Sequence, residues 1–147
     1  MSKKNLIAGQ SGGPTAAINS SLYGVVSEAL KHTEEIDHVY GMVNGIEGFL
    51  NGIVLDFQEA LPGEQLLALT WTPGAYLGSC RYKLPESLED PVYPKLFQKF
   101  EEMNIGWFFL SAATIPWIPS ASFPAMLKRS AATSVSSVSR RPLITIL

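Results

Sequence analysis

The chain has 147 residues, a hydrophobic fraction of 46% and a net charge of −2 at pH 7, which is typical of one soluble globular domain with a core. The apolar run near the amino terminus is only a few residues long, so we expect neither a signal peptide nor a membrane helix. Cys80 is the only cysteine, so no intrachain disulfide can form, which favours a reducing, cytoplasmic location. The Cys and His residues lack metal-ligand spacing, and we expect no metal site made from them.

Charge and glycine content divide the chain sharply after residue 109. Residues 1–109 contain thirteen acidic and seven basic side chains, a net charge of −6, and all 12 glycines. Residues 110–147 contain four basic side chains and no acidic one, a net charge of +4. Four bases in such a stretch are a weak signal for nucleic acid or a membrane surface, so we expect neither as a partner. The break separates two parts, 1–109 and 110–147, and requires an explanation.

The amino-terminal part begins with a strand, a glycine-rich loop and a helix. Residues 6–8 form a short apolar run typical of a buried strand, and residues 15–30 have the apolar periodicity of a helix. Between them, Gly12 and Gly13 would let the backbone approach an anion closely, and the helix start would offer unpaired N–H groups. The loop is neither a Walker A sequence nor a GxGxxG fingerprint. Phosphate binding and a tight turn without a ligand both remain open on these residues.

The following segments alternate between strand and helix patterns. Strands are expected at residues 37–43, 53–56 and 106–109, and a helix at residues 93–103. Residues 45–52 are expected to be rich in turns, with a short helical piece. His38 lies at the start of the second strand, where a partly exposed structural histidine is favoured over a catalytic one. This alternation predicts an α/β domain with a mostly parallel sheet. In such a sheet the ligand lies beyond the carboxyl ends of the strands, where the first loop is placed.

A second glycine-containing loop spans residues 72–83. Gly74, Gly78, Ser79 and Arg81 fall within it, so it could close over phosphate oxygens. Arginine is suited to this because its forked donors match the oxygens of a planar oxyanion. A solvated arginine on a surface turn is the alternative.

Four segments together resemble the phosphofructokinase family, and closely its pyrophosphate-dependent branch. They read GQSGGPTAAIN at residues 9–19, NGIEG at 44–48, TPGAYLGSCR at 72–81 and NIGWFF at 104–109. The likeness covers residues 4–109, with the motifs in the family's order and spacing. The resemblance implies the start of a three-layer, mostly parallel α/β domain of phosphofructokinase type, truncated in this chain.

The resemblance also implies an activity. Enzymes of this family transfer a phosphoryl group from ATP or pyrophosphate to the 1-hydroxyl of fructose 6-phosphate in glycolysis, with Mg²⁺, and they form homo-oligomers. Carried onto this chain, the amides of Gly12 and Gly13 would cradle the transferred phosphate, and Arg81 would clamp the donor. Both roles suit phosphoryl transfer, in which positioning and charge neutralisation dominate.

Residues 110–147 depart from the family pattern. The family continues with Gly-Gly-Asn-Asp-Ser, whose aspartate helps to hold Mg²⁺, and later with Pro-Lys-Thr-Ile-Asp-Asn-Asp, which supplies the base for the sugar hydroxyl. Neither string occurs here. We therefore assign no catalytic residue and no metal ligand, and we expect this chain to be inactive alone.

A change of reading frame explains the departure. Suppose that the first two bases of each codon here are the last two bases of a codon in another frame. Residues 111–118, SAATIPWI, then allow Ile-Gly-Gly-Asn-Asp-Ser-Met-Asp, and residues 140–147, RRPLITIL, allow Pro-Lys-Thr-Ile-Asp-Asn-Asp-Leu. We therefore predict that residues 110–147 are translated out of frame, after the loss of one base near codons 109–110. The restored motifs look more like the pyrophosphate-using branch.

Judged by its own residues, 110–147 should be poorly ordered or form only opportunistic structure. Because the domain is truncated, we also expect an open edge after the last strand, which should make the product prone to aggregation. Two other functions remain open. The chain could be a non-catalytic phosphate- or pyrophosphate-binding fragment or regulatory module. It could also be a genuine short enzyme, in which Lys128 would be the only available base in this part.

Overall fold

The computed structural model describes residues 3–11, 17–78, 89–112 and 143–146. The strands are β1 (Lys4–Ser11), β2 (Ile36–Met42), β3 (Val54–Asp56), β4 (Ile105–Ala112) and β5 (Leu143–Ile146). The helices are α1 (Ile18–Ala29), α2 (Gly45–Leu50), α3 (Phe57–Ala60) and α4 (Val92–Glu102), with the 3₁₀ helix η1 (Gly63–Trp71). No helix in these described ranges is long and apolar enough to cross a bilayer.

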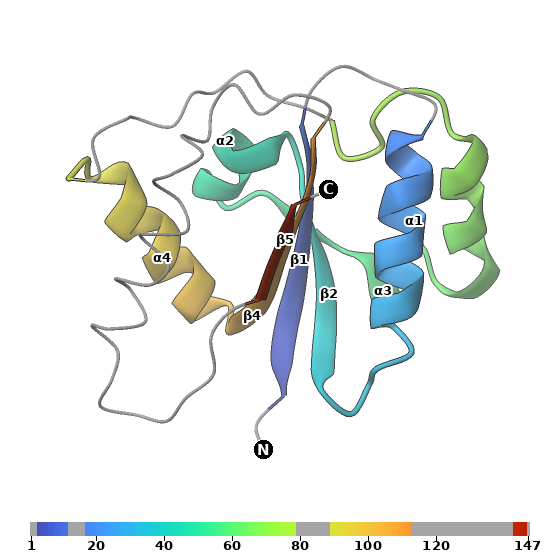
Figure 1. The fold of residues 1–147 in the computed structure, drawn as a ribbon, viewed down its shortest axis with the longest axis horizontal. Coiled ribbons are helices and arrows are strands. Elements are labelled where there is room, and N and C mark those ends of the chain that lie inside the picture. The colour runs from blue at the N-terminus through green and yellow to red at the C-terminus, as the bar shows by residue number, and fades with distance from the viewer. Residues whose placement is uncertain (1–2, 12–16, 79–88, 113–142, 147) are drawn as a thin grey trace.

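The strands form one sheet with the order β3-β2-β1-β4-β5 (Figure 1). β1 is parallel to both β2 and β4, and β5 is parallel to β4. Among the strands in the described ranges, β3 alone is antiparallel, and it pairs with β2 at the edge. The chain therefore moves outward from β1 to β2 and then returns to the other side of β1 to form β4.

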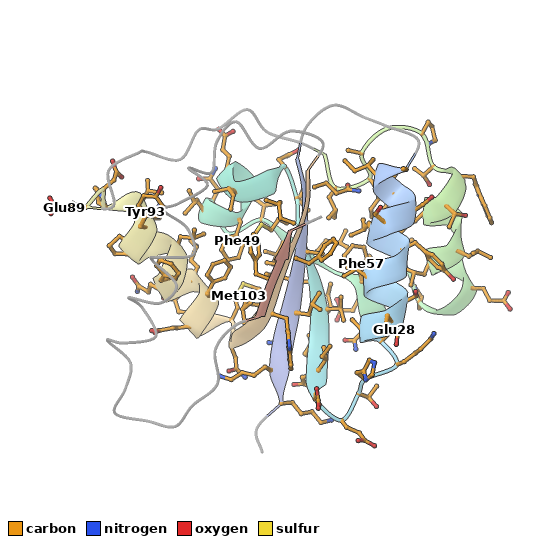
Figure 2. All side chains as sticks on the ribbon, viewed as in Figure 1. Glu28, Phe49, Phe57, Glu89, Tyr93 and Met103 are labelled. Carbon is orange, nitrogen blue, oxygen red and sulfur yellow. The ribbon has the colours of Figure 1, made fainter. Side chains whose placement is uncertain are left out.

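Helices cover both faces of the sheet, which gives three layers (Figure 1). α1 and η1 lie on one face, and α2 and α4 lie on the other. Alternate residues of β1 enter different cores: Ile7 packs in the cluster that contains Phe49, whereas Leu6 and Ala8 pack in the cluster that contains Phe57. Figure 2 shows Phe49 and Phe57 on opposite sides of the sheet. This period of two is what a strand buried on both faces requires.

The turn between β2 and α2 depends on its own sequence, NGIEG. Asn44 has a left-handed backbone with φ 57°, a conformation that asparagine tolerates better than most residues. A Cβ added at Gly48 would lie 1.7 Å from the carbonyl oxygen of Val43. Only glycine therefore fits at residue 48, because α2 packs directly against the end of the preceding strand.

The structure confirms the predicted fold class, a three-layer α/β arrangement with a mostly parallel sheet. The expected helix at residues 93–103 is α4, and the expected strand at 106–109 extends further, to Ala112. α1 begins at Ile18, later than the residue 15 expected from periodicity.

The expectation of an open edge beside the last strand is wrong, because β5 occupies that edge. Leu143 pairs with Trp107 and Ile146 pairs with Leu110. The β-branched residues of β5 suit a strand. The sequence pattern within residues 110–147 could not show that this strand would pair with β4.

Candidate functional site

The candidate site lies at the carboxyl end of β1. α1 follows this end in the chain, and the two sheet neighbours of β1, β2 and β4, lie on opposite sides of it. A reversal of this kind in a parallel sheet creates the crevice in which α/β proteins bind their ligands. The loop of residues 72–78 comes to the same place, although more than fifty residues separate it from β1.

Asn19, in the first turn of α1, attaches this loop to the helix. Its Nδ2 donates to the carbonyl oxygens of Thr72 (2.8 Å) and Gly74 (2.5 Å). Its Oδ1 accepts from the backbone N–H of Tyr76 (2.9 Å). One side-chain amide therefore bonds three backbone groups of a segment without regular structure, whose own polar groups need partners.

Gln10, near the end of β1, attaches the same loop to the sheet. Its Oε1 accepts from the backbone N–H of Leu77 (3.0 Å). Its Nε2 lies 3.2 Å from the carbonyl oxygen of Ile18 and 3.0 Å from Oδ1 of Asn19, and it donates to both. Gln10 is fully buried and Asn19 is 2% exposed, so these bonds are shielded from competing water.

Asn44 supplies a third attachment, from the turn after β2. Its backbone N–H donates to the carbonyl oxygen of Leu77 at 2.8 Å. Gly78, with φ +73°, packs so closely that a Cβ there would lie 2.5 Å from Asn44 Oδ1. Both backbone polar groups of Leu77 are thus held, one by the β1 side and one by the β2 side.

The three residues proposed from sequence to bind the donor phosphate, Gly12, Gly13 and Arg81, lie outside the described residues. What the structure places are the segments on either side of them. β1 ends at Ser11, immediately before Gly12, and the loop fixed by Gln10, Asn19 and Asn44 is described as far as Gly78. The structure therefore brings together the strand that precedes Gly12 and the loop that precedes Arg81.

Sequence reasoning assigned no role to Gln10 or Asn19, although both fall within the GQSGGPTAAIN motif. The available signal was polarity at buried positions. Asn19 is spaced three and seven residues from Leu22 and Val26, on the apolar face of the helix. A polar residue on such a face needs a specific partner, and the motif gives no indication that the partner lies in residues 72–77.

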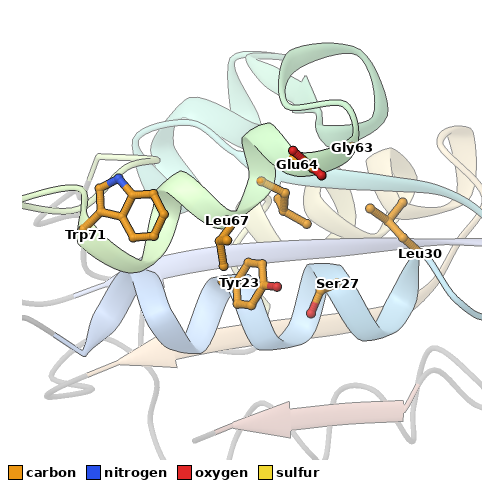
Figure 3. A pocket seen from close by; sticks show the side chains of 8 residues that line it. Tyr23, Ser27, Leu30, Gly63, Glu64, Leu67 and Trp71 are labelled. Carbon is orange, nitrogen blue, oxygen red and sulfur yellow. The ribbon is translucent and has the colours of Figure 1, made fainter.

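Two other features of the described residues are less suited to phosphate. An open groove of about 630 Å³ runs between α1 and η1 (Figure 3), and it exposes Trp71 (68%) and Leu67 (44%). Its described lining includes Glu64 and no Lys or Arg, so it offers no charge complementary to a polyanion.

The second feature is a histidine–carboxylate pair at the edge formed by β2 and β3. His38 Nδ1 lies 2.9 Å from Asp56 Oδ2, and the His38 side chain is 44% exposed. Asp56 also caps α3 by accepting from the backbone N–H of Gln58. His38 is thus partly exposed, as expected, and its partner has a structural task at a helix start.

The described side chains at the candidate site do not fit a Mg²⁺ ion. Magnesium is usually held by one or two carboxylates. Among the described residues, no three His, Cys, Asp or Glu side chains gather closely enough to hold a metal ion. The buried polar groups at the end of β1 are the amides of Gln10 and Asn19, and residues 110–147 contain no acidic side chain.

Comparison with known proteins identifies the family. The family model described as phosphofructokinase matches residues 5–111. The chain belongs to the phosphofructokinase family. The chain is 40% identical over 111 residues to a protein of Methylococcus capsulatus and 37% identical over 110 residues to one of Halomonas elongata. Both relatives are named pyrophosphate–fructose 6-phosphate 1-phosphotransferase, and each alignment covers 74% of this chain and 26% of the relative.

Solved structures agree with this assignment. A crystal structure of pyrophosphate-dependent phosphofructokinase from Marinobacter aquaeolei matches with a TM-score of 0.66 and 39% identity, over 74% of this chain and 26% of that one. The chain thus spans about a quarter of the length of the phosphofructokinases that it matches. The matched region includes Gln10, Asn19 and the loop of residues 72–78.

Proposed function

We propose that this chain carries the donor-phosphate region of a pyrophosphate-dependent phosphofructokinase. In the complete enzyme, this region would hold pyrophosphate for phosphoryl transfer to the 1-hydroxyl of fructose 6-phosphate. The amides of Gly12 and Gly13 would contact the transferred phosphate, and Arg81 would neutralise charge on the donor. Like the family, the complete enzyme would be cytoplasmic and homo-oligomeric.

One observation carries this proposal: the loop before Arg81 is bonded to the strand before Gly12. Leu77 N–H donates to Gln10 Oε1 at 3.0 Å, although these residues are 67 positions apart. A polyanion needs donors that converge from separate parts of the chain, and backbone amides at a strand-to-helix turn are suited to this task. The names of the relatives favour pyrophosphate over ATP as the donor.

Residues 110–147 are proposed to be read out of frame. The family match stops at residue 111, close to the boundary at residue 109 that composition indicates. In the chain as written, this part lacks Asp, Glu, His and Cys, so Lys128 is its only candidate base. We therefore expect the chain as written to bind the donor and not to catalyse transfer.

A direct test of the frame is to resequence the DNA across codons 105–147 and beyond. An additional base near codons 109–110, with an open frame continuing through Pro-Lys-Thr-Ile-Asp-Asn-Asp, is the expected result. The protein from that frame should form fructose 1,6-bisphosphate from fructose 6-phosphate and pyrophosphate. An unchanged DNA sequence would reject the frame change and favour the second candidate, a non-catalytic phosphate- or pyrophosphate-binding module.

Binding by the chain as written is tested separately by titration calorimetry of the full 147-residue chain with sodium pyrophosphate. Saturable heat that is absent with sodium sulfate is expected, because the proposed amides and Arg81 all lie in this chain. A folded chain that gives no heat with pyrophosphate would contradict both the donor-site proposal and the binding-module alternative.

A further inference from the structure

Buried side-chain amides are costly unless all of their polar atoms have partners. In the described part of the chain, no buried side-chain nitrogen or oxygen lacks a hydrogen bond. Gln10 and Asn19 meet this requirement largely through one segment, since four of their hydrogen bonds go to the backbone of residues 72–77. Their bonding therefore determines the conformation of that segment as well as satisfying the amides.

Apart from these amides, the segment is held at one end, where Leu77 is buried in the core and its carbonyl oxygen accepts from Asn44 N–H. Residues 72–78 follow η1 without belonging to a helix or strand, and such backbone depends on side chains for its hydrogen bonds. Gly74 and Gly78 both have positive φ, so the segment contains two residues with wide conformational freedom. Removing the amide bonds of Gln10 and Asn19 should loosen residues 72–76, while the hydrogen bonds between the strands of the sheet remain.

We propose that Asn19 and Gln10 are positioning residues: they hold residues 72–78 against the end of β1 in the conformation that pyrophosphate binding requires. This inference takes its ligand, pyrophosphate, from the proposed function. The claim that the two amides hold residues 72–78 in place does not depend on that function. Neither amide is exposed, so their effect on binding would act through the loop. A change at either residue should weaken pyrophosphate binding without removing any group that contacts it.

Asn5 provides a matched control at the other end of β1. It is 9% exposed, its Nδ2 donates to the carbonyl oxygen of Met103 at 2.6 Å, and its Oδ1 accepts from the backbone N–H of His38 at 3.0 Å. Asn5 in β1 and Asn19 in α1 are thus both buried amides that bond backbone groups distant in the sequence. Only Asn19 lies beside the candidate site.

The test compares Asn19→Asp with Asn5→Asp in the full chain. Each change keeps the side-chain shape and the acceptor but replaces the donating nitrogen with an oxygen that faces backbone carbonyls. Hydrogen exchange should show lost protection at the Tyr76 and Leu77 amides only in Asn19→Asp. Calorimetry should show pyrophosphate binding at least about tenfold weaker in Asn19→Asp and within about twofold of wild type in Asn5→Asp.

Gln10→Glu is the second variant if Asn19→Asp does not fold, because it retains an acceptor for Leu77 while removing the donor to Ile18 and Asn19. It should weaken binding in the same direction. A folded variant of Asn19 or Gln10 with wild-type exchange at Tyr76 and Leu77 would overturn the positioning role. Lost protection with unchanged pyrophosphate affinity would overturn its link to binding. If the wild type itself does not bind pyrophosphate, the proposed function fails, and the exchange comparison still decides the positioning role.

Discussion

Gln10 Nε2 and Asn19 Oδ1 are 3.0 Å apart, and this buried hydrogen bond connects the end of β1 to the first turn of α1. The same two side chains bond the backbone of residues 72–77. The strand, the helix and the distant loop are therefore coupled through two amides. Loss of one of these hydrogen bonds should weaken the others.

Replacing Gln10 with leucine should destabilise the chain by about 2–4 kcal/mol, because Leu77 N–H and the Ile18 carbonyl would be left buried without their present partner. Urea unfolding followed by circular dichroism measures the change. Gln98→Leu is the control, since the Gln98 amide bonds Glu102 on an exposed helix face, and a change of no more than about 0.5 kcal/mol is expected there. Equal effects would show that burial of the Gln10 bonds contributes little.

Two glycine-to-alanine changes should shift the stability of the folded chain in opposite directions. Gly48→Ala places a Cβ 1.7 Å from the Val43 carbonyl oxygen, so α2 must move, at a cost of about 3 kcal/mol or more. Gly24 lies in α1 with no atom within 4 Å of an added Cβ, and Gly24→Ala should stabilise by about 0.5–1 kcal/mol. Thermal unfolding of both variants checks the pair. A stable Gly48→Ala variant would mean that the turn after β2 adapts easily.

Arg81→Gln should weaken pyrophosphate binding by about ten- to a hundredfold, the range expected when a charge-assisted hydrogen bond to an anion is lost. Lys83→Gln removes the same charge two residues further along the chain, and it should change the affinity by less than about threefold through screened long-range attraction. Calorimetry at fixed ionic strength measures both. Equal losses would indicate general electrostatic attraction in place of a specific arginine contact.

Tyr40 should make the chain less stable at alkaline pH. Burial first, and then the carboxylates of Asp56, Asp37 and Glu59, raise the pKa of Tyr40 above its ordinary value of 10.0. Above that pH the unfolded chain loses the phenol proton before the folded chain does. The free energy of unfolding therefore falls as pH rises, until the folded pKa is passed.

Tyr40→Phe removes this ionisation and retains a ring that can stack on His38, whose centroid lies 5.6 Å away. Urea unfolding on both sides of pH 10 should show a shallower alkaline loss of stability in the variant. Parallel pH profiles for the wild type and Tyr40→Phe would contradict the assignment.

The sequence alone located several elements in the first 109 residues, although it predicted neither α3 nor η1. Short strand-like segments located β1, β2 and β4, and apolar residues at helical spacing located α4, because burial selects those patterns directly. The motif order and spacing identified the phosphofructokinase family, and the family comparison confirms it.

Tertiary structure decided which segments meet. Local periodicity could not show that β5 pairs with β4, since pairing depends on contacts between residues far apart in the chain. It also could not show why the first motif contains Gln10 and Asn19. Their amides find hydrogen-bond partners in residues 72–77, where this loop passes the end of β1. Because a buried polar group without a partner is costly, these bonds hold β1, α1 and the loop together.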